Sequence, residues 1–170
     1  TDGAAVGYLS PRAKKLIPGM VGFRSPEDIW DMKSDRMDLP EDASRFEFTT
    51  LHFGALQGLA MSIEEMLEIG QDEIWAHDMK LADAVIEGAM GMGLEVVSPT
   101  DPEQRSAIVS IRTPRGEDSS QIVRRLQDEF GILVTDRSGM IRVSPHIDND
   151  THQIEMLFQS LRTILDKTSS

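Results

Sequence analysis

The sequence predicts an α+β fold, in which helices cover one face of an antiparallel β-sheet. Two adjoining segments, 54–69 and 71–93, carry apolar residues at helical spacing. From residue 71 onward, β-rich runs and helical patterns follow one another in the order helix, strand, strand, helix, strand, strand, helix. That order describes one antiparallel sheet with its helices gathered on a single face.

The N-terminal residues are less regular. Residues 4–10, AAVGYLS, predict one short strand that ends at the breaker Ser-Pro-Arg. Residues 11–45 contain several prolines and the mixed-charge run DMKSDRMDLPED. This segment is too long for a compact connector and too apolar for a disordered tail. We therefore expect residues 1–53 to pack on material outside this chain, as the remnant of a larger domain.

Two helices are predicted next. The helix over 54–69 stops at Gly70 and is expected to link residues 1–53 to a small domain spanning 54–170. Its apolar face comprises Leu56, Leu59, Ile63, Met66 and Leu67. The helix over 71–93 has acidic residues in its first turn, where the helix dipole favours them. Its apolar face comprises Ile74, Leu81, Val85 and Ala89.

The remaining elements complete the sheet and its covering helices. Strands are predicted over 94–98 and 106–113, and a helix then runs from a cap at Asp118, Ser119 or Ser120 through Phe130, where Gly131 ends it. Residues 132–136 and 140–144 predict a hairpin over Arg137-Ser138-Gly139.

The last predicted helix begins at a cap on Asn149 or Asp150. Its inward face comprises Ile154, Leu157, Phe158, Leu161 and Leu165.

Composition and charge exclude several function classes. The 170 residues include 17 basic and 29 acidic side chains, giving a formal net charge of −12 at pH 7. Counterion release cannot favour such a surface on a phosphate backbone, so nucleic acid is not an expected partner. No apolar run approaches the length of a membrane span, and no membrane partner is expected. The chain has no cysteine, which excludes disulfides and cysteine-ligated metal and favours a cytoplasmic location. The four histidines lack i, i+4 spacing, so no metal site is predicted.

Arg142 is the first candidate binding residue. In the predicted strand MIRVS, Ile141 and Val143 point to one face, so Arg142 points to the other. The arginine can be a solvated surface charge paired with one of the many carboxylates. Alternatively, it can present a two-pronged donor to a carboxylate ligand, a task for which arginine is better suited than lysine. Spacing alone leaves both interpretations open.

Two longer segments carry a family resemblance. RFEFTTLHFGALQGL (45–59) and RSGMIRVSPHIDND (137–150) resemble, in this order, segments of the class V aminotransferase group of pyridoxal-phosphate enzymes. That group includes cysteine desulfurases, isopenicillin-N-epimerase-like proteins and kynureninases. Its first motif, Arg-Phe-Glu-x-Gly-Thr-x-Asn, is matched by Arg45, Phe46, Glu47 and Thr50, with Thr49 in the glycine place and His52 in the asparagine place. Its second, Arg-x-Ser before a Tyr-Asn-Thr helix start, is matched by Arg142, Ser144, Asp148, Asn149 and Asp150.

The resemblance implies the small C-terminal domain of the aspartate-aminotransferase-like fold, with residues 1–53 as the tail of the large cofactor-binding domain. It implies pyridoxal 5′-phosphate as cofactor, an amino acid as substrate and a homodimer. The family's Schiff-base lysine would lie just before Thr1, so we expect this chain alone to be inactive.

The resemblance also implies residue roles. Arg142 matches the arginine that grips the substrate α-carboxylate, and Arg137 is expected to assist it. Thr50 matches a hydroxyl that contacts the phosphate of the neighbouring subunit's cofactor, with His52 beside it. From the residues alone, Thr50 equally suits a helix N-cap, and Arg137 equally suits a solvated turn.

Departures from the family pattern narrow the expected reaction. Cysteine desulfurases need a nucleophilic cysteine near the turn at Ser138, and this chain has none. Desulfuration by that mechanism is therefore excluded for this chain, which favours an aminotransferase or epimerase-like branch. The alternative from a different class is a stand-alone, non-catalytic α+β module that binds a ligand or regulates another protein.

Overall fold

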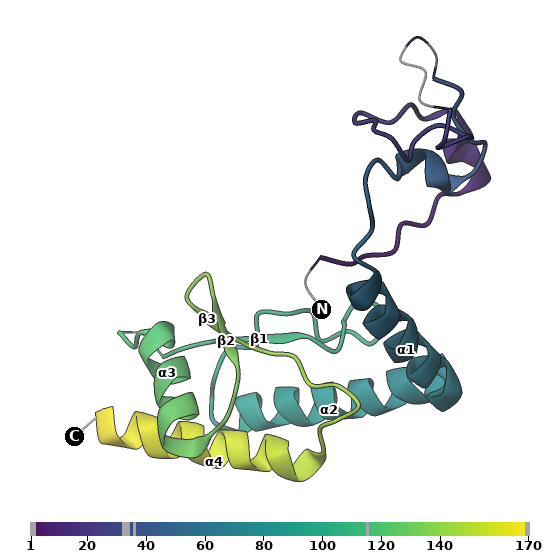
Figure 1. The fold of residues 1–170 in the computed structure, drawn as a ribbon. Coiled ribbons are helices and arrows are strands. Elements are labelled where there is room, and N and C mark those ends of the chain that lie inside the picture. The colour runs from purple at the N-terminus through teal and green to yellow at the C-terminus, as the bar shows by residue number, and fades with distance from the viewer. Residues whose placement is uncertain (1–2, 32–34, 36, 115, 169–170) are drawn as a thin grey trace. The chain divides into compact units, whose positions relative to one another are not determined.

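The computed structural model describes residues 3–31, 35, 37–114 and 116–168. It divides the chain into two compact units, Thr1–Glu68 and Ile69–Ser170, which are described separately below (Figure 1). The predicted division into 1–53 and 54–170, with a linking helix between them, stays a prediction.

The first unit contains two short 3-10 helices, Pro11–Lys15 and Ala43–Phe46, and helix α1, Phe53–Ile69. Its internal order depends on polar contacts. The Ser25 hydroxyl donates to the carbonyl of Glu47 at 3.0 Å and accepts from the N–H of Gly22 at 3.1 Å. A Cβ at position 22 would lie 2.1 Å from the Phe48 carbonyl oxygen, so this close approach requires glycine.

The strand predicted over 4–10 is wrong. Among the described residues, no segment pairs with it, and Val6 and Tyr8 are 72% and 87% exposed. A strand needs a hydrogen-bonding neighbour, and an apolar pattern alone cannot supply one.

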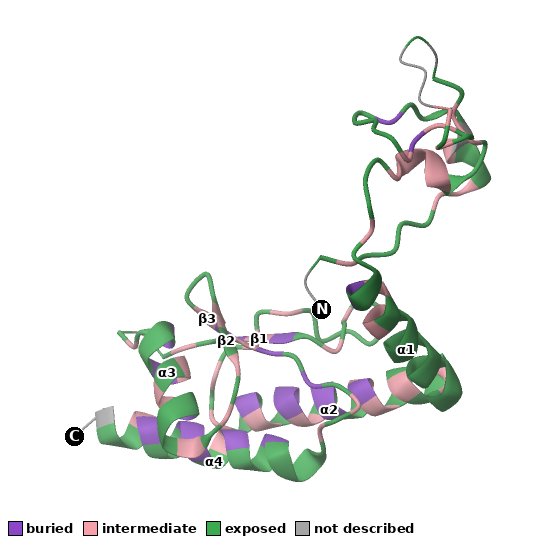
Figure 2. Cartoon of the chain, in the orientation of Figure 1, coloured by how far each residue is buried: buried purple, intermediate pink, exposed green. Residues whose placement is uncertain are grey.

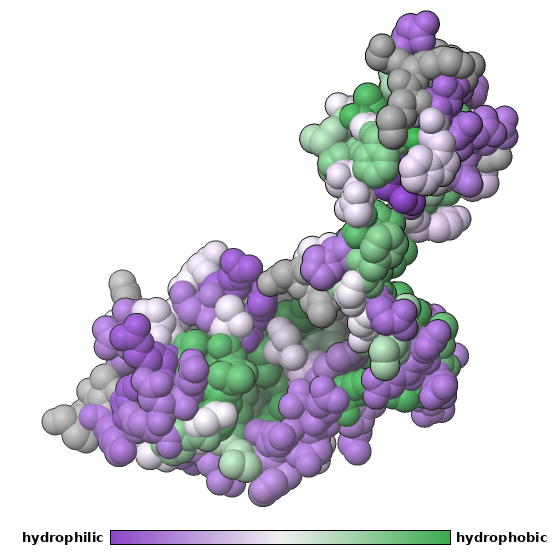
Figure 3. Space-filling view, viewed as in Figure 1, coloured by the Kyte–Doolittle hydropathy of each residue, from purple (hydrophilic) through white to green (hydrophobic). Residues whose placement is uncertain are grey.

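Helix α1 begins one residue before the predicted start and ends at the predicted residue, but it lacks the predicted burial. Ala55 is the residue it buries, whereas Ile63 and Leu67 on the expected inward face are 40% and 65% exposed. Figure 3 shows hydrophobic surface at the start of this helix.

The second unit contains helices α2 (Gln71–Gly91), α3 (Ser119–Phe130) and α4 (Thr151–Thr168) and strands β1 (Val109–Arg112), β2 (Thr135–Arg137) and β3 (Met140–Val143). The strands form one antiparallel sheet in the order β1-β3-β2. The strand predicted over 94–98 is reduced to a single bridge, Val96 to Ile111. Two backbone hydrogen bonds of 2.9 Å still attach this segment to β1, so it extends the sheet by a short edge.

The helix caps in this unit follow the predicted chemistry. Asp118 accepts from the N–H of Ser120 at 2.9 Å and begins α3, and Gly131 ends that helix at φ 69°. Of the two predicted caps for α4, Asp150 fills the role, since its carboxylate accepts from the N–H of Gln153 at 2.8 Å.

One hydrophobic core holds the three helices to the sheet. It includes Leu81, Val85, Leu126, Ile111, Ile141, Leu161 and Ile164, each at most 2% exposed. Figure 2 shows these buried positions along α2 and α4 and in the sheet. Because Ile111, Ile141 and Val143 all point into this core, the opposite face of the sheet carries the alternate residues. The predicted α+β architecture is therefore confirmed.

Candidate functional site

The candidate site lies on the open face of the sheet, opposite the core. The predicted hairpin forms, but Arg137 belongs to β2 and pairs with Met140, so Ser138 and Gly139 alone make the turn, with φ values of 53° and 74°. Positive φ at both central residues is typical of the type I′ turn, which matches the twist of the two strands.

Arg142 lies on the central strand of the sheet. It pairs with Ser110 of β1 on one side and with Thr135 of β2 on the other. Within the hairpin, β2 is the edge strand of the sheet and β3, which carries Arg142, lies between β1 and β2. The predicted alternation is confirmed, since Ile141 and Val143 are 2% and 4% exposed toward the helices.

The Arg142 side chain lacks a partner within the described part of the chain. Its Nε is buried and makes no hydrogen bond to any described residue. A buried donor without an acceptor costs stability, and more so when it is charged. The neighbouring Ser110 and Thr135 carry no charge that could compensate the guanidinium.

Arg137 lies on the same face. Cross-strand partners share a face, so Thr135 faces the same way as Arg142, and Arg137 lies two residues from Thr135. Arg137 is exposed. The register thus brings together the two arginines that the sequence singled out.

Sequence reasoning missed a third arginine on this face. Arg112 pairs with Met140 across β1 and β3, and Met140 in turn pairs with Arg137. The Arg112 Nε donates to the Glu95 carboxylate at 2.7 Å. The strand-pairing register was the missing signal, because residues 112 and 137 are far apart in sequence.

Thr50 and His52 lie in the other unit, at the start of α1, and both are exposed. The Nδ1 atom of His52 accepts from the N–H of Ala55 at 3.0 Å, so His52 caps the helix. The cap assigned to Thr50 from the residues alone is therefore wrong. A neutral histidine that accepts at Nδ1 carries its proton on Nε2, so His52 presents an N–H donor outward.

A second polar cluster fixes the loop between β3 and α4. His77 Nε2 donates to the Asn149 carbonyl at 2.9 Å, and His146 Nδ1 lies 2.9 Å from the Asp78 carboxylate. Asp78 is only 8% exposed. Two consecutive residues of α2 thereby attach the loop that follows Arg142. The spacing of these histidines in the sequence predicted no metal site and gave no sign of this attachment.

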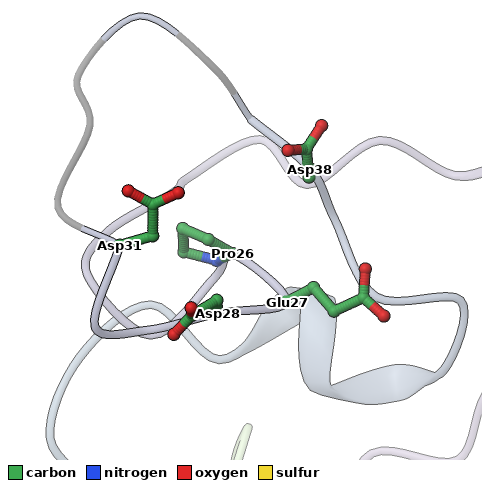
Figure 4. A pocket seen from close by; sticks show the side chains of 5 residues that line it. All are labelled: Pro26, Glu27, Asp28, Asp31 and Asp38. Carbon is green, nitrogen blue, oxygen red and sulfur yellow. The ribbon is translucent and has the colours of Figure 1, made fainter.

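Acidic residues gather elsewhere without forming a metal site. Figure 4 shows the side chains of Glu27, Asp28, Asp31 and Asp38 around a pocket, with carboxylates pointing in different directions. Over the described residues, no group of three or more potential ligands could hold a metal ion. The same residues include no helix that is long and apolar enough to cross a membrane.

The antiparallel sheet with helices packed on one face is an α+β fold, and its other face carries the arginines. No protein-family model matches the chain. In structure, the chain is similar to a cysteine desulfurase from Thermococcus onnurineus, with a TM-score of 0.76 at 23% identity over 88% of this chain and 40% of that one. It is also similar to a C-DES variant with glycine covalently linked to its PLP cofactor, with a TM-score of 0.73 at 21% identity over 85% and 37% of the two chains.

Curated relatives agree with the structural matches. A probable cysteine desulfurase of Pyrococcus abyssi is 25% identical over 164 residues, which cover 90% of this chain and 40% of the relative. Pyridoxamine–pyruvate transaminase of Mesorhizobium japonicum is 25% identical over 131 residues, which cover 77% and 29%. The chain thus spans about 40% or less of these relatives. Its homologues are cysteine desulfurases and aminotransferases, and the partial coverage is consistent with a C-terminal fragment of a class V aminotransferase-like enzyme.

Proposed function

We propose that this chain is the C-terminal part of a pyridoxal-phosphate-dependent enzyme that transforms an amino acid, and that Arg142 holds the substrate α-carboxylate. The buried Nε of Arg142, with no partner among the described residues, carries the proposal. A carboxylate can accept two parallel hydrogen bonds from a guanidinium and would supply the missing acceptor.

The role of this chain in catalysis is positional. By fixing the carboxylate, Arg142 orients the substrate Cα and selects which of its bonds aligns for cleavage. Arg137, on the same sheet face, is the second candidate for contact with the substrate. When bound, pyridoxal phosphate would supply an electron sink for the bond that breaks.

The start of α1 fits a phosphate group. The Thr50 hydroxyl and the Nε2–H of His52 are both donors on exposed residues. The first turn of a helix adds unpaired backbone N–H groups and the positive end of the dipole. These residues would hold the phosphate of a cofactor bound by the partner subunit of a homodimer.

The absence of cysteine favours an aminotransferase or epimerase-like reaction. Although several relatives are cysteine desulfurases, this chain cannot contribute a thiolate that accepts sulfur from the substrate.

Kinetics of the intact enzyme that carries this chain test the proposal. The Arg142→Lys variant should keep its fold but lose about a hundredfold in kcat/KM with the amino acid, since a point ammonium cannot reproduce the two-pronged contact. The decarboxylated amine of the same substrate should be much less affected. Arg124→Lys, on the exposed surface of α3, is the matched control and should change neither rate.

Equal losses with both substrates, or no loss with either, would contradict the carboxylate role of Arg142. The coding region upstream of Thr1 gives an independent test. The proposal expects a lysine that follows a parallel-sheet pattern, whereas a start codon there would favour the stand-alone module.

A further inference from the structure

The open face of the sheet carries two rows of cross-strand neighbours. The first row is Ser110, Arg142 and Thr135, and the second is Arg112, Met140 and Arg137. The only charged side chains in these rows are three guanidinium groups, in a chain whose net charge is −12. Such a concentration of one charge sign attracts ligands of the opposite sign.

The two outer arginines of the second row differ in their partners. Arg112 is neutralised by Glu95 at 2.7 Å. Arg137 is exposed and makes no hydrogen bond or ion pair to any described residue. Arg137 and Arg142 are therefore the two guanidinium groups on this face whose charge no described carboxylate compensates.

The spacing of these two groups suits one ligand with two anionic ends. Arg137 lies diagonally across the strand pair from Arg142, a relation in which backbone positions are about 7–8 Å apart and long side chains still reach one another. Met140 pairs with Arg137 across the strands and lies two residues from Arg142 along β3. Its flexible thioether can pack against the aliphatic chain of a ligand.

We propose that this face selects a dicarboxylate: Arg142 binds one carboxylate, and Arg137 binds the second and determines specificity. The inference rests on the proposed role of Arg142 and adds the substrate class, an amino acid with an acidic side chain. Arg112 remains paired with Glu95 and limits the site on the β1 side.

Binding to the whole 170-residue chain tests the inference without the cofactor. The probes are glutarate and its monoamide, which have the same shape and differ by one charge, at a fixed ionic strength. The Nε–H signals of arginine side chains in ¹⁵N NMR spectra report which guanidinium each ligand reaches. Glutarate should shift the signals of Arg137 and Arg142 and bind about tenfold more tightly than the monoamide, since a charged hydrogen bond adds on the order of 1.5 kcal/mol.

The Arg137→Gln variant should bind glutarate and the monoamide equally, at the monoamide affinity of the unaltered chain. Arg112→Gln is the matched control and should preserve most of the preference for glutarate. If Arg137→Gln keeps that preference while the monoamide still reaches Arg142, the inference fails and the proposed function stands. If neither ligand shifts the Arg142 signal, both fail.

Discussion

Replacing Arg142 by methionine should stabilise the isolated chain. The substitution keeps a flexible, unbranched stem and removes the guanidinium, whose Nε is buried without a partner among the described residues. Leaving a buried polar group unpaired costs about 1–3 kcal/mol, and more for a charged group. Arg142 is only partly buried, so water still reaches the rest of the side chain. We therefore expect a gain near the lower end, about 1 kcal/mol in the free energy of unfolding.

Urea denaturation followed by circular dichroism measures this change. With a slope of about 1–3 kcal/mol per molar urea, the midpoint should rise by roughly 0.3–1 M at an unchanged slope. Arg137→Met is the matched control, because Arg137 is exposed on the same sheet face. Its midpoint should stay nearly unchanged, as for most surface substitutions.

A lower midpoint for Arg142→Met than for Arg137→Met would refute the reasoning. It would mean that the Arg142 guanidinium stabilises the fold and is not kept for a ligand. The expected gain instead matches a residue retained for function at a cost in stability.

Two further changes test the local structure. His52→Asn should preserve α1, because asparagine is also a good N-cap. His52→Ala should lower the free energy of unfolding by about 1 kcal/mol and reduce the helix content measured by circular dichroism. Thr50→Ala, beside the cap, is the control and should leave the helix intact. Hydrogen bonds from Ser120 hold the pKa of Asp118 below its usual value of 3.8, so its stabilising effect is complete above that pH and is lost as the pH falls through the lower folded pKa. In acid titrations of stability, Asp118→Asn should remove this part of the pH dependence while keeping the cap; an unchanged titration would show that Asp118 is not its source.

The fold of the second unit could be predicted because local signals agree there with the packing. Gly70 and Gly131 end helices at positive φ, Asp118 and Asp150 begin them, and Ser138-Gly139 turns the hairpin. Each signal acts within a few residues, so a single sequence contains it.

The N-terminal unit could not be predicted equally well, because its apolar pattern refers to partners that local sequence does not identify. Val6 and Tyr8 are residue types that favour strands, but their segment pairs with no strand among the described residues. The inward face predicted for α1 likewise remains exposed at Ile63 and Leu67. Periodicity predicts which face of an element is apolar but not what covers that face.

The candidate site falls between these two cases. The alternation around Arg142 is a local property, and the sequence predicted it. The arrangement of Arg112, Arg137 and Arg142 on one face depends on the register of three strands, and the pairing of β1 with β3 joins residues about thirty positions apart. The attachment of the following loop by Asp78 and His146 is equally nonlocal.

Three other arginines of the second unit have carboxylate partners. Arg105 pairs with Asp83, Arg125 with Glu129 and Arg112 with Glu95, as expected in a chain with an excess of acidic residues. Hydrogen bonding by these guanidinium groups holds the pKa values of Asp83 and Glu129 below their usual range. Exposed arginines without a carboxylate partner also occur among the described residues, as at Arg124, so the lack of a partner is most informative at Arg142, whose Nε atom is buried. Arg137 and Arg142 have none among the described residues, and Arg142 is partly buried in that state. An anionic ligand accounts for both facts, since it provides the missing charge only when the site is in use.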